Sequence, residues 1–321
     1  MGSAFAAPTY QVTKTVPLGT PDKWDYVVYD AESHRAFVAH GDRLTVVDGK
    51  DGSIVGTVSG LSTATHGIGI STETGRGYTD DSEAGLVGSF DLHTLKPIKT
   101  VKTGGDTDAI AVDPASGHVF VINGDTGTVT VMDPKADSRL ATIEVGGKLE
   151  YAAADGHGKV FVNGASKGEI VRIDTATNAV DARWPVPDCT SPHGLAIDPE
   201  TRRLFSSCVN GVLAVVDAED GRLVAKLPIG LGTDAAAFDP KRKLILSSNG
   251  RDGTLSVIQE QNADTFVALA PVKTAISART LAIDPETGRL YLAVGDAEPA
   301  TTGKPHIAPG SLKLLFLDPV P

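Results

Sequence analysis

The fold is decided by residues 193–230, HGLAIDPETRRLFSSCVNGVLAVVDAEDGRLVAKLPIG. An apolar run ends at Asp198 and is followed by a DP turn, a run of strand-forming residues and a polar turn at Gly211. A second apolar run ends at Asp217, and a DG turn leads into a last strand. Short strands separated by such turns are typical of hairpins, so this stretch predicts four consecutive antiparallel strands.

The same layout recurs along the chain. The first strands of the repeats begin at residues 25, 66, 108, 150, 193, 234 and 279, which lie 41 to 45 residues apart. They read DYVVYD, HGIGIS, DAIAVD, EYAAAD, HGLAID, DAAAFD and RTLAID. A lone four-stranded sheet cannot bury both of its faces, but a closed ring of sheets can. The repeats therefore predict an all-β, seven-bladed β-propeller with four-stranded antiparallel blades.

The two ends of the chain are expected to share one blade. The seventh repeat ends after three strands in LKLLFLDPVP, and the N-terminal TYQVTKTVPLG matches the fourth strand of other repeats. We expect this N-terminal strand to complete blade 7, because a broken ring would expose two sheet edges. Residues 9–321 are thus predicted to form a single propeller domain, preceded in residues 1–8 by a cloning scar and a signal-peptide remnant.

Charge narrows the range of partners. The 321-residue chain has a formal net charge of −11 and contains no Lys/Arg run. Nucleic acid and anionic membranes both require a basic face, so we expect neither as a partner. No apolar stretch approaches the roughly 20 residues that span a bilayer, so membrane insertion is not expected. We expect a monomer.

The N-terminus and the cysteines indicate export. The small-residue pattern AFA at positions 4–6 is typical of the residues before a signal-peptidase cleavage site. The chain has two cysteines and no C-x-x-C motif, which fits an oxidising compartment. We therefore predict a periplasmic or secreted protein, with a cytosolic protein as the alternative.

The two cysteines are expected to form a disulfide. Counting back from the DPETRR turn pairs Ala196 with Phe205 and His193 with about Cys208, which places Cys189 near the end of the second strand. A Cys189–Cys208 bridge is therefore geometrically reasonable. In the alternative interpretation, Cys208 is a thiolate ligand for copper or zinc beside His193.

Several repeats carry a family resemblance. The segments GHVFVINGDTGTVTVMD and RRLFSSCVNGVLAVVD resemble the YVTN repeat, and residues 9–321 are similar to YncE-like bacterial propellers. The resemblance implies a propeller fold and export. Proteins with such repeats include surface-layer and periplasmic proteins. Similar propellers include lactonases and the metal-dependent virginiamycin B lyase, so the resemblance implies no single activity.

The functional prediction depends on the residue that begins the first strand of each repeat. These seven positions are expected to surround one mouth of the central channel, and all of them are ionisable. They are Asp25, His66, Asp108, Glu150, His193, Asp234 and Arg279. Strand starts without a shared role would include Ser, Thr, Gly and apolar residues, so this ring is a candidate ligand site.

Two imidazoles and several carboxylates make a ligand set for a divalent transition metal such as zinc, iron, nickel, copper or manganese. We predict His66, His193 and Glu150 as metal ligands, and the same three as candidates for proton transfer in catalysis. The predicted ligand-binding residues are Asp25, Asp108, Glu150, Asp234 and Arg279. Arg279 alternatively clamps the carboxylate or phosphate of an organic ligand. His66 and His193 come from blades 2 and 5, nearly opposite each other, so a single ion would have to bridge the channel.

The other histidines have expected positions too. Those at the blade turns of the opposite end are His34, His93, His118 and His157. His40 is expected on the same side as the ring. His306 belongs to an insertion at residues 295–310, expected at the mouth as either a cap or an ordinary surface loop.

Three functions remain open from the sequence. The first is an exported binding protein that holds a divalent metal ion or a small anionic ligand at the channel mouth, with a propeller face available to a protein partner. The second is a metal-dependent lyase or lactone hydrolase that uses the same site. The third is a structural or protein-interaction propeller without a ligand, in which the ring charges are solvated or paired across blades.

Overall fold

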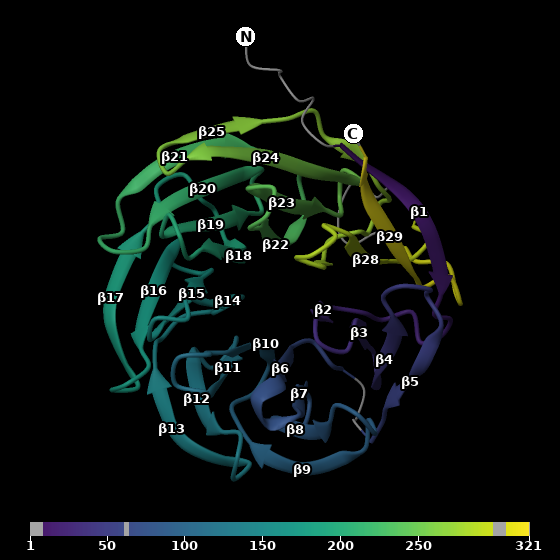
Figure 1. Ribbon diagram of the computed structural model, residues 1–321. Coiled ribbons are helices and arrows are strands. Elements are labelled where there is room, and N and C mark those ends of the chain that lie inside the picture. The colour runs from purple at the N-terminus through teal and green to yellow at the C-terminus, as the bar shows by residue number, and fades with distance from the viewer. Residues whose placement is uncertain (1–8, 61–63, 298–305, 321) are drawn as a thin grey trace.

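The computed structural model describes residues 9–60, 64–297 and 306–320. These residues form seven antiparallel sheets arranged around a central axis (Figure 1), so the predicted all-β propeller is confirmed. The expected signal-peptide remnant in residues 1–8 and the middle of the 295–310 insertion lie outside the described residues. Within the described residues, no helix is long and apolar enough to cross a membrane.

The first four blades follow the chain in order. Blade 1 consists of β2 (Val27–Asp30), β3 (Arg35–His40), β4 (Arg43–Asp48) and β5 (Ile54–Val58). Blade 2 consists of β6 (Ile68–Ser71), a 3-10 turn η1 (Thr72–Thr74), β7 (Arg76–Asp81), β8 (Leu86–Asp91) and β9 (Pro97–Lys102). Blade 3 consists of β10 (Thr107–Val112), β11 (Val119–Asn123), β12 (Thr128–Asp133) and β13 (Ser138–Glu144). Blade 4 consists of β14 (Ala152–Ala154), β15 (Lys159–Gly164), β16 (Glu169–Asp174) and β17 (Ala179–Pro185).

The last three blades complete the ring. Blade 5 consists of β18 (Pro192–Asp198), β19 (Arg203–Cys208), β20 (Val212–Asp217) and β21 (Leu223–Pro228). Blade 6 consists of β22 (Thr233–Asp239), β23 (Leu244–Asn249), β24 (Thr254–Asn262) and a fourth strand in two pieces, β25 (Thr265–Ala268) and β26 (Val272–Lys273). Blade 7 consists of β27 (Leu281–Ile283), β28 (Leu290–Val294), β29 (Lys313–Val320) and β1 (Thr9–Pro17).

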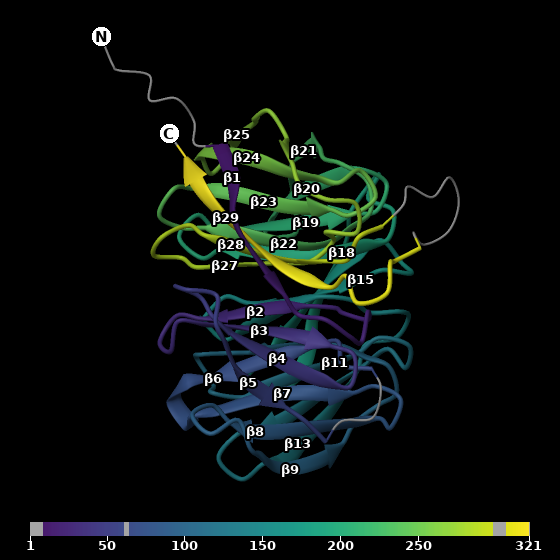
Figure 2. The same cartoon turned by 90° about the vertical axis from the view of Figure 1, so that its right-hand side faces the viewer.

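The N-terminal strand closes the ring as predicted. β1 pairs antiparallel with β29 from Thr9 opposite Val320 to Pro17 opposite Lys313, with one irregularity between Val12 and Lys14. The two strands lie side by side at the outer edge of blade 7 (Figures 1 and 2). Every blade therefore has four strand positions filled, and β29 has no open edge.

The core lies between the blades. Every residue of β19 is buried, whereas the outermost strand of the same blade, β21, is half-exposed. Side chains of adjacent blades interdigitate; the rings of Phe205 in blade 5 and Phe238 in blade 6 lie 5.4 Å apart between centroids. Each inner sheet is covered on both faces, which explains why its strands are continuously apolar rather than alternating.

The aspartates that end the first strands are turn residues. Asp198 accepts a hydrogen bond from the amide of Glu200 at 2.9 Å, and Asp113 accepts one from the amide of Ser116 at 3.0 Å. Such side-chain bonds mimic a backbone turn and explain why DP pairs recur at the same position. These turns lie at the end of the blades away from the channel mouth described below.

Cys189 and Cys208 form the predicted disulfide, with their Cα atoms 5.4 Å apart. Because Cys208 is bonded, the alternative interpretation of it as a thiolate ligand is wrong. The predicted register was also displaced by one residue, since Cys208 lies opposite Pro192 and not His193. A register shift between Pro192 and Leu195 is the cause, whereas Ala196 opposite Phe205 was predicted correctly.

Candidate functional site

The ring residues meet at one mouth of the central channel. Arg279 of blade 7 contacts Asp25 of blade 1 and Asp234 of blade 6. His193 of blade 5 contacts Asp234 and Glu150 of blade 4. These contacts link ring positions of five blades into one chain of ionic side chains around the axis.

Arg279 is held by three oxygen atoms. Its Nη2 donates to the Trp24 carbonyl oxygen at 2.8 Å and to Asp25 Oδ2 at 3.1 Å, and its Nε lies 2.7 Å from Asp234 Oδ2. The guanidinium also lies over the ring of Trp24, 5.9 Å from its centroid. Burial raises the pKa of Asp25, and Arg279 opposes that rise. The arginine therefore joins blade 7 to both neighbouring blades.

His193 lies between two carboxylates. Its Nδ1 is 2.6 Å from Asp234 Oδ1 and its Nε2 is 3.6 Å from Glu150 Oε1, with Ser191 Oγ at 3.2 Å from Nε2. A carboxylate cannot donate a hydrogen bond, so Nδ1 carries the proton and donates to Asp234. In the neutral ring the lone pair is then on Nε2, on the side of Glu150. Glu150, His193 and Asp234 each offer a ligand atom, and these atoms all lie within 4.8 Å of one another.

Glu150 is buried and has two further partners. The ammonium of Lys148 lies 3.3 Å from Glu150 Oε1, and the carboxyl of Asp108 is hydrogen-bonded to Glu150. Burial, together with the hydrogen bond and the charge of Glu150, raises the pKa of Asp108 well above its ordinary value of 3.8. Two carboxyl groups can form that hydrogen bond only when one holds a proton, so Asp108 is the donor.

His66 lies apart from this group. Its Nδ1 donates to the Thr107 carbonyl oxygen at 3.0 Å and lies 3.7 Å from Oδ2 of the buried Asp80. Burial lowers the pKa of His66, but the charges of Asp25 and Asp80 together raise it above its ordinary value of 6.5. Of the three predicted metal ligands, the structure thus groups His193 and Glu150 with Asp234, and places His66 against Asp80.

Asp80 was not anticipated from the sequence. It is completely buried in β7, and its Oδ1 accepts hydrogen bonds from the amides of His66 and Gly67, both at 2.8 Å. Its Oδ2 has no hydrogen-bond partner within the described residues. Burial raises the pKa of Asp80 to about 8. Two acids in the buried second strand RGYTDD were a signal, since most second strands are apolar or carry amides and hydroxyls there.

Two tyrosines lie directly beneath the ring. Tyr26 follows Asp25 in blade 1 and Tyr151 follows Glu150 in blade 4, and their ring centroids are 4.9 Å apart. Because blades 1 and 4 lie far apart in the ring, these two side chains can touch only by extending toward the central axis. The same position in the other blades is small: Gly67, Ala109, Gly194, Ala235 and Thr280. Tyr26 is only 2% exposed, so the two rings meet in the interior beneath the ring of charged residues.

The charges of the ring carboxylates act on Tyr26. Burial raises the pKa of Tyr26 well above its ordinary value of 10.0, and the charges of Asp108, Asp234, Asp25 and Glu150 add to that rise. Four carboxylates from four blades therefore act on one phenol.

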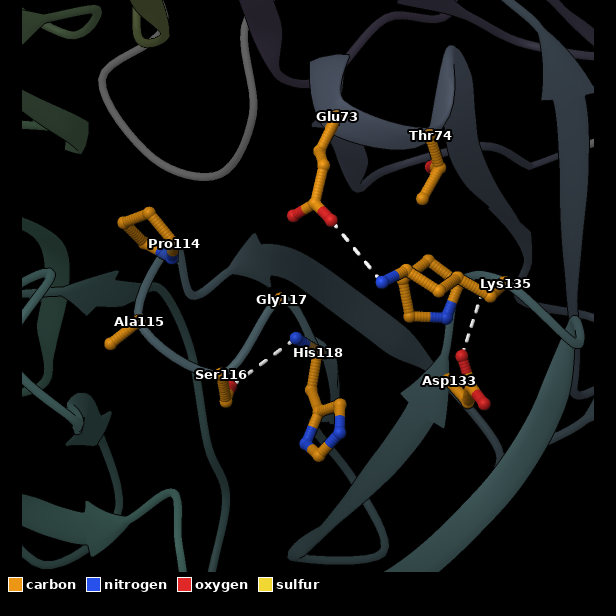
Figure 3. Close-up of a pocket in the computed structure, with 10 residues that line it drawn as sticks. Glu73, Thr74, Pro114, Ala115, Ser116, Gly117, His118, Asp133 and Lys135 are labelled. Atoms are coloured by element: carbon orange, nitrogen blue, oxygen red, sulfur yellow. Dashed lines mark hydrogen bonds and ion pairs between the residues drawn. The ribbon is translucent and has the colours of Figure 1, made fainter.

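The remaining histidines are structural or peripheral. His40 is buried; its Nε2 donates to the Pro21 carbonyl oxygen at 2.7 Å and its Nδ1 accepts from Thr45 Oγ1 at 2.8 Å. His306 is exposed, and the residues before it lie outside the described part of the chain. His118 lines a separate cavity of about 410 Å³ between the turns of blades 2 and 3, where Glu73 and Lys135 form an ion pair of 3.2 Å (Figure 3). None of the residues that line this cavity belongs to the ring.

No family model and no curated protein matches the sequence. Solved structures match the fold. The WD40 repeats of RRP9 superpose with a TM-score of 0.80 at 13% identity, covering 96% of this chain and 100% of that chain. A chain of the mitotic checkpoint complex gives a TM-score of 0.80 at 12% identity, covering 99% and 94%. A chain of hydrazine synthase from Kuenenia stuttgartiensis gives 0.72 at 15%, covering 84% and 91%.

These similarities concern the fold alone. A seven-bladed propeller is a scaffold that supports both protein-interaction surfaces and enzyme sites, so activity has to be inferred from the site itself. In this chain the candidate site is the charged ring above the two tyrosines.

Proposed function

We propose that this chain is an exported, YncE-like propeller protein that binds a divalent transition-metal ion at the channel mouth. His193 and Glu150 are the ligands, Asp108 is a further carboxylate beside them, and Asp234 orients His193. The observation that carries the proposal is the line of side chains Asp234–His193–Glu150.

The tautomer of His193 supports metal binding. A metal-bound histidine commonly donates its second ring N–H to a carboxylate, which fixes the ring and makes the ligating nitrogen more basic. The bond from Nδ1 to Asp234 at 2.6 Å has this form. The 3.6 Å between His193 Nε2 and Glu150 Oε1 is close to the spacing of about 3.4 Å expected for two ligands of one tetrahedral zinc ion.

Metal binding at this place has to displace existing partners. Lys148 pairs with Glu150, and Asp108 holds a proton against the same carboxylate. A bound cation replaces the ammonium and favours release of that proton, so the metal affinity should rise with pH. Export is supported by the disulfide between Cys189 and Cys208, which persists in oxidising compartments.

The test is zinc binding measured by isothermal titration calorimetry and elemental analysis. We expect about one equivalent of zinc in the unaltered protein and an affinity loss of about a hundredfold or more in His193→Ala and Glu150→Gln. His157→Ala is the matched control, because His157 lies in a turn at the opposite end of blade 4. If all four proteins bind zinc equally, or none does, the metal site is refuted.

A metal-dependent lyase or lactone hydrolase is the second candidate. It is favoured by Asp108, whose carboxyl group lies beside the candidate ligand Glu150 and whose raised pKa suits a group that passes a proton to or from a substrate. The zinc-loaded protein should then open a simple lactone at a rate that Asp108→Asn reduces at least tenfold without loss of zinc. Equal rates for the two proteins and for free zinc would eliminate this candidate.

A further inference from the structure

Arg279 is a second feature of the mouth. Its Nη2 donates to Trp24 and Asp25, and its Nε lies against Asp234. The side chain is nevertheless 29% exposed. The guanidinium is therefore fixed by its neighbours while part of the side chain still has access to solvent.

One carboxylate connects this arginine to the proposed metal position. Asp234 places Oδ2 at 2.7 Å from Arg279 Nε and Oδ1 at 2.6 Å from His193 Nδ1. The Arg279 guanidinium and the His193 imidazole thus lie on two sides of the Asp234 carboxylate. A guanidinium fixed in this way recognises a carboxylate well, because little rotamer freedom remains to be lost on binding.

The formal charges of the mouth make anion binding depend on the metal. Even when Asp108 is neutral, the ring carboxylates Asp25, Glu150 and Asp234 outnumber the two permanent cations, Arg279 and Lys148. This excess of negative charge disfavours a free anion. One divalent ion at Glu150 and His193 outweighs that excess and adds a second attractive centre.

The tyrosine pair lies beneath the ring residues. With Tyr26 and Tyr151 in contact across the axis, a ligand has access from the mouth alone and lies above the two rings. A ligand that reaches both the metal and Arg279 has to carry an oxygen group at each of two ends. A short chain between them suffices, because only Asp234 separates the two centres.

We infer that the mouth binds a small organic dicarboxylate together with the metal ion, one carboxylate on the metal and the other on the exposed part of the Arg279 guanidinium. This inference rests on the proposed metal site and specifies its ligand. The metal binds first, because without it the ring repels the acid.

The test uses succinate as the probe, titrated into the protein with and without saturating zinc. Zinc affinity is measured first for every variant, so that each is fully loaded before succinate is added. We expect succinate to bind the zinc-loaded protein at least tenfold more tightly than the metal-free protein, and more tightly than butyrate, which has one carboxylate. Arg279→Gln should weaken succinate binding to the loaded protein at least tenfold.

Two further variants keep the result interpretable. Arg279→Lys keeps the positive charge between Asp25 and Asp234 but lacks the fork, so it should fold and still lose most of the succinate affinity. Arg251→Gln is the control, since Arg251 is an exposed arginine in the loop between β23 and β24 on the same side of the ring. Folding of each variant is checked by its thermal unfolding curve.

The outcomes separate the two proposals. Zinc binding without succinate binding, or equal succinate affinity for the unaltered protein and both Arg279 variants, overturns this inference and leaves the metal site standing. Equal succinate affinity with and without zinc also overturns it. Absence of zinc binding overturns both proposals.

Discussion

The disulfide provides a prediction whose size follows from the structure. Cys189 and Cys208 are separated by 19 residues, and both are buried against blades 4 and 5. Closing a loop of this length removes unfolded-state entropy worth about 3 kcal/mol at 25 °C. Reducing the bond should therefore lower the free energy of unfolding by about 3 kcal/mol, with little change in the native packing.

The assay is urea unfolding at equilibrium, with and without a phosphine reductant. The reductant keeps the two thiols unpaired in the unfolded chain. In the folded chain both sulfur atoms stay packed in the core, so the two conditions differ only in the bridge. The double variant Cys189→Ala/Cys208→Ala is the control and should not respond to the reductant. If the unaltered protein has the same free energy of unfolding under both conditions, the reasoning is wrong.

Three further predictions concern burial and ring closure. The pKa of Asp80 is raised by burial from its ordinary value of 3.8 to about 8, so the native state binds the proton more tightly and stability should fall as the pH rises through this interval. The raised pKa of His66 acts in the same direction, and urea unfolding at several pH values should show a flatter profile for Asp80→Asn. Asn163→Ala should cost roughly 2–3 kcal/mol in the same assay, because Asn163 donates to the carbonyl oxygens of His193 and Gly194 across the blade interface. Deleting β1 should expose the edge of β29 and produce aggregates on size-exclusion chromatography; a monomer of unchanged stability would contradict the closure.

The architecture could be predicted almost completely from the sequence. Seven repeats with turn residues at fixed offsets leave few alternatives, and the truncated last repeat has its missing strand at the other end of the chain. The one error of register, Cys208 opposite Pro192, arose from an irregularity of the β18–β19 pairing. Such an irregularity depends on backbone detail near the mouth that alternation of residue types does not reveal.

The candidate site could be predicted only in part. The repeat placed all seven ring residues at one mouth, but which side chains touch depends on their length and rotamer. His193 therefore meets Glu150 and Asp234, whereas His66 is held by Thr107. The tyrosines had a readable signal, because Tyr26 and Tyr151 are the two large residues at a position that is otherwise small. Asn163 gave no such signal, because a polar residue is common in the inner hairpin of a blade.

The tyrosine pair also has a kinetic consequence. Since the two rings meet beneath the ring residues, a bound molecule must leave through the same opening by which it arrived. Its dissociation rate is then controlled by whatever surrounds that opening, including Trp24 and the ends of the 295–310 insertion. A protein that docked on this side of the ring would slow both arrival and departure to the same degree, and would change the residence time without changing the affinity.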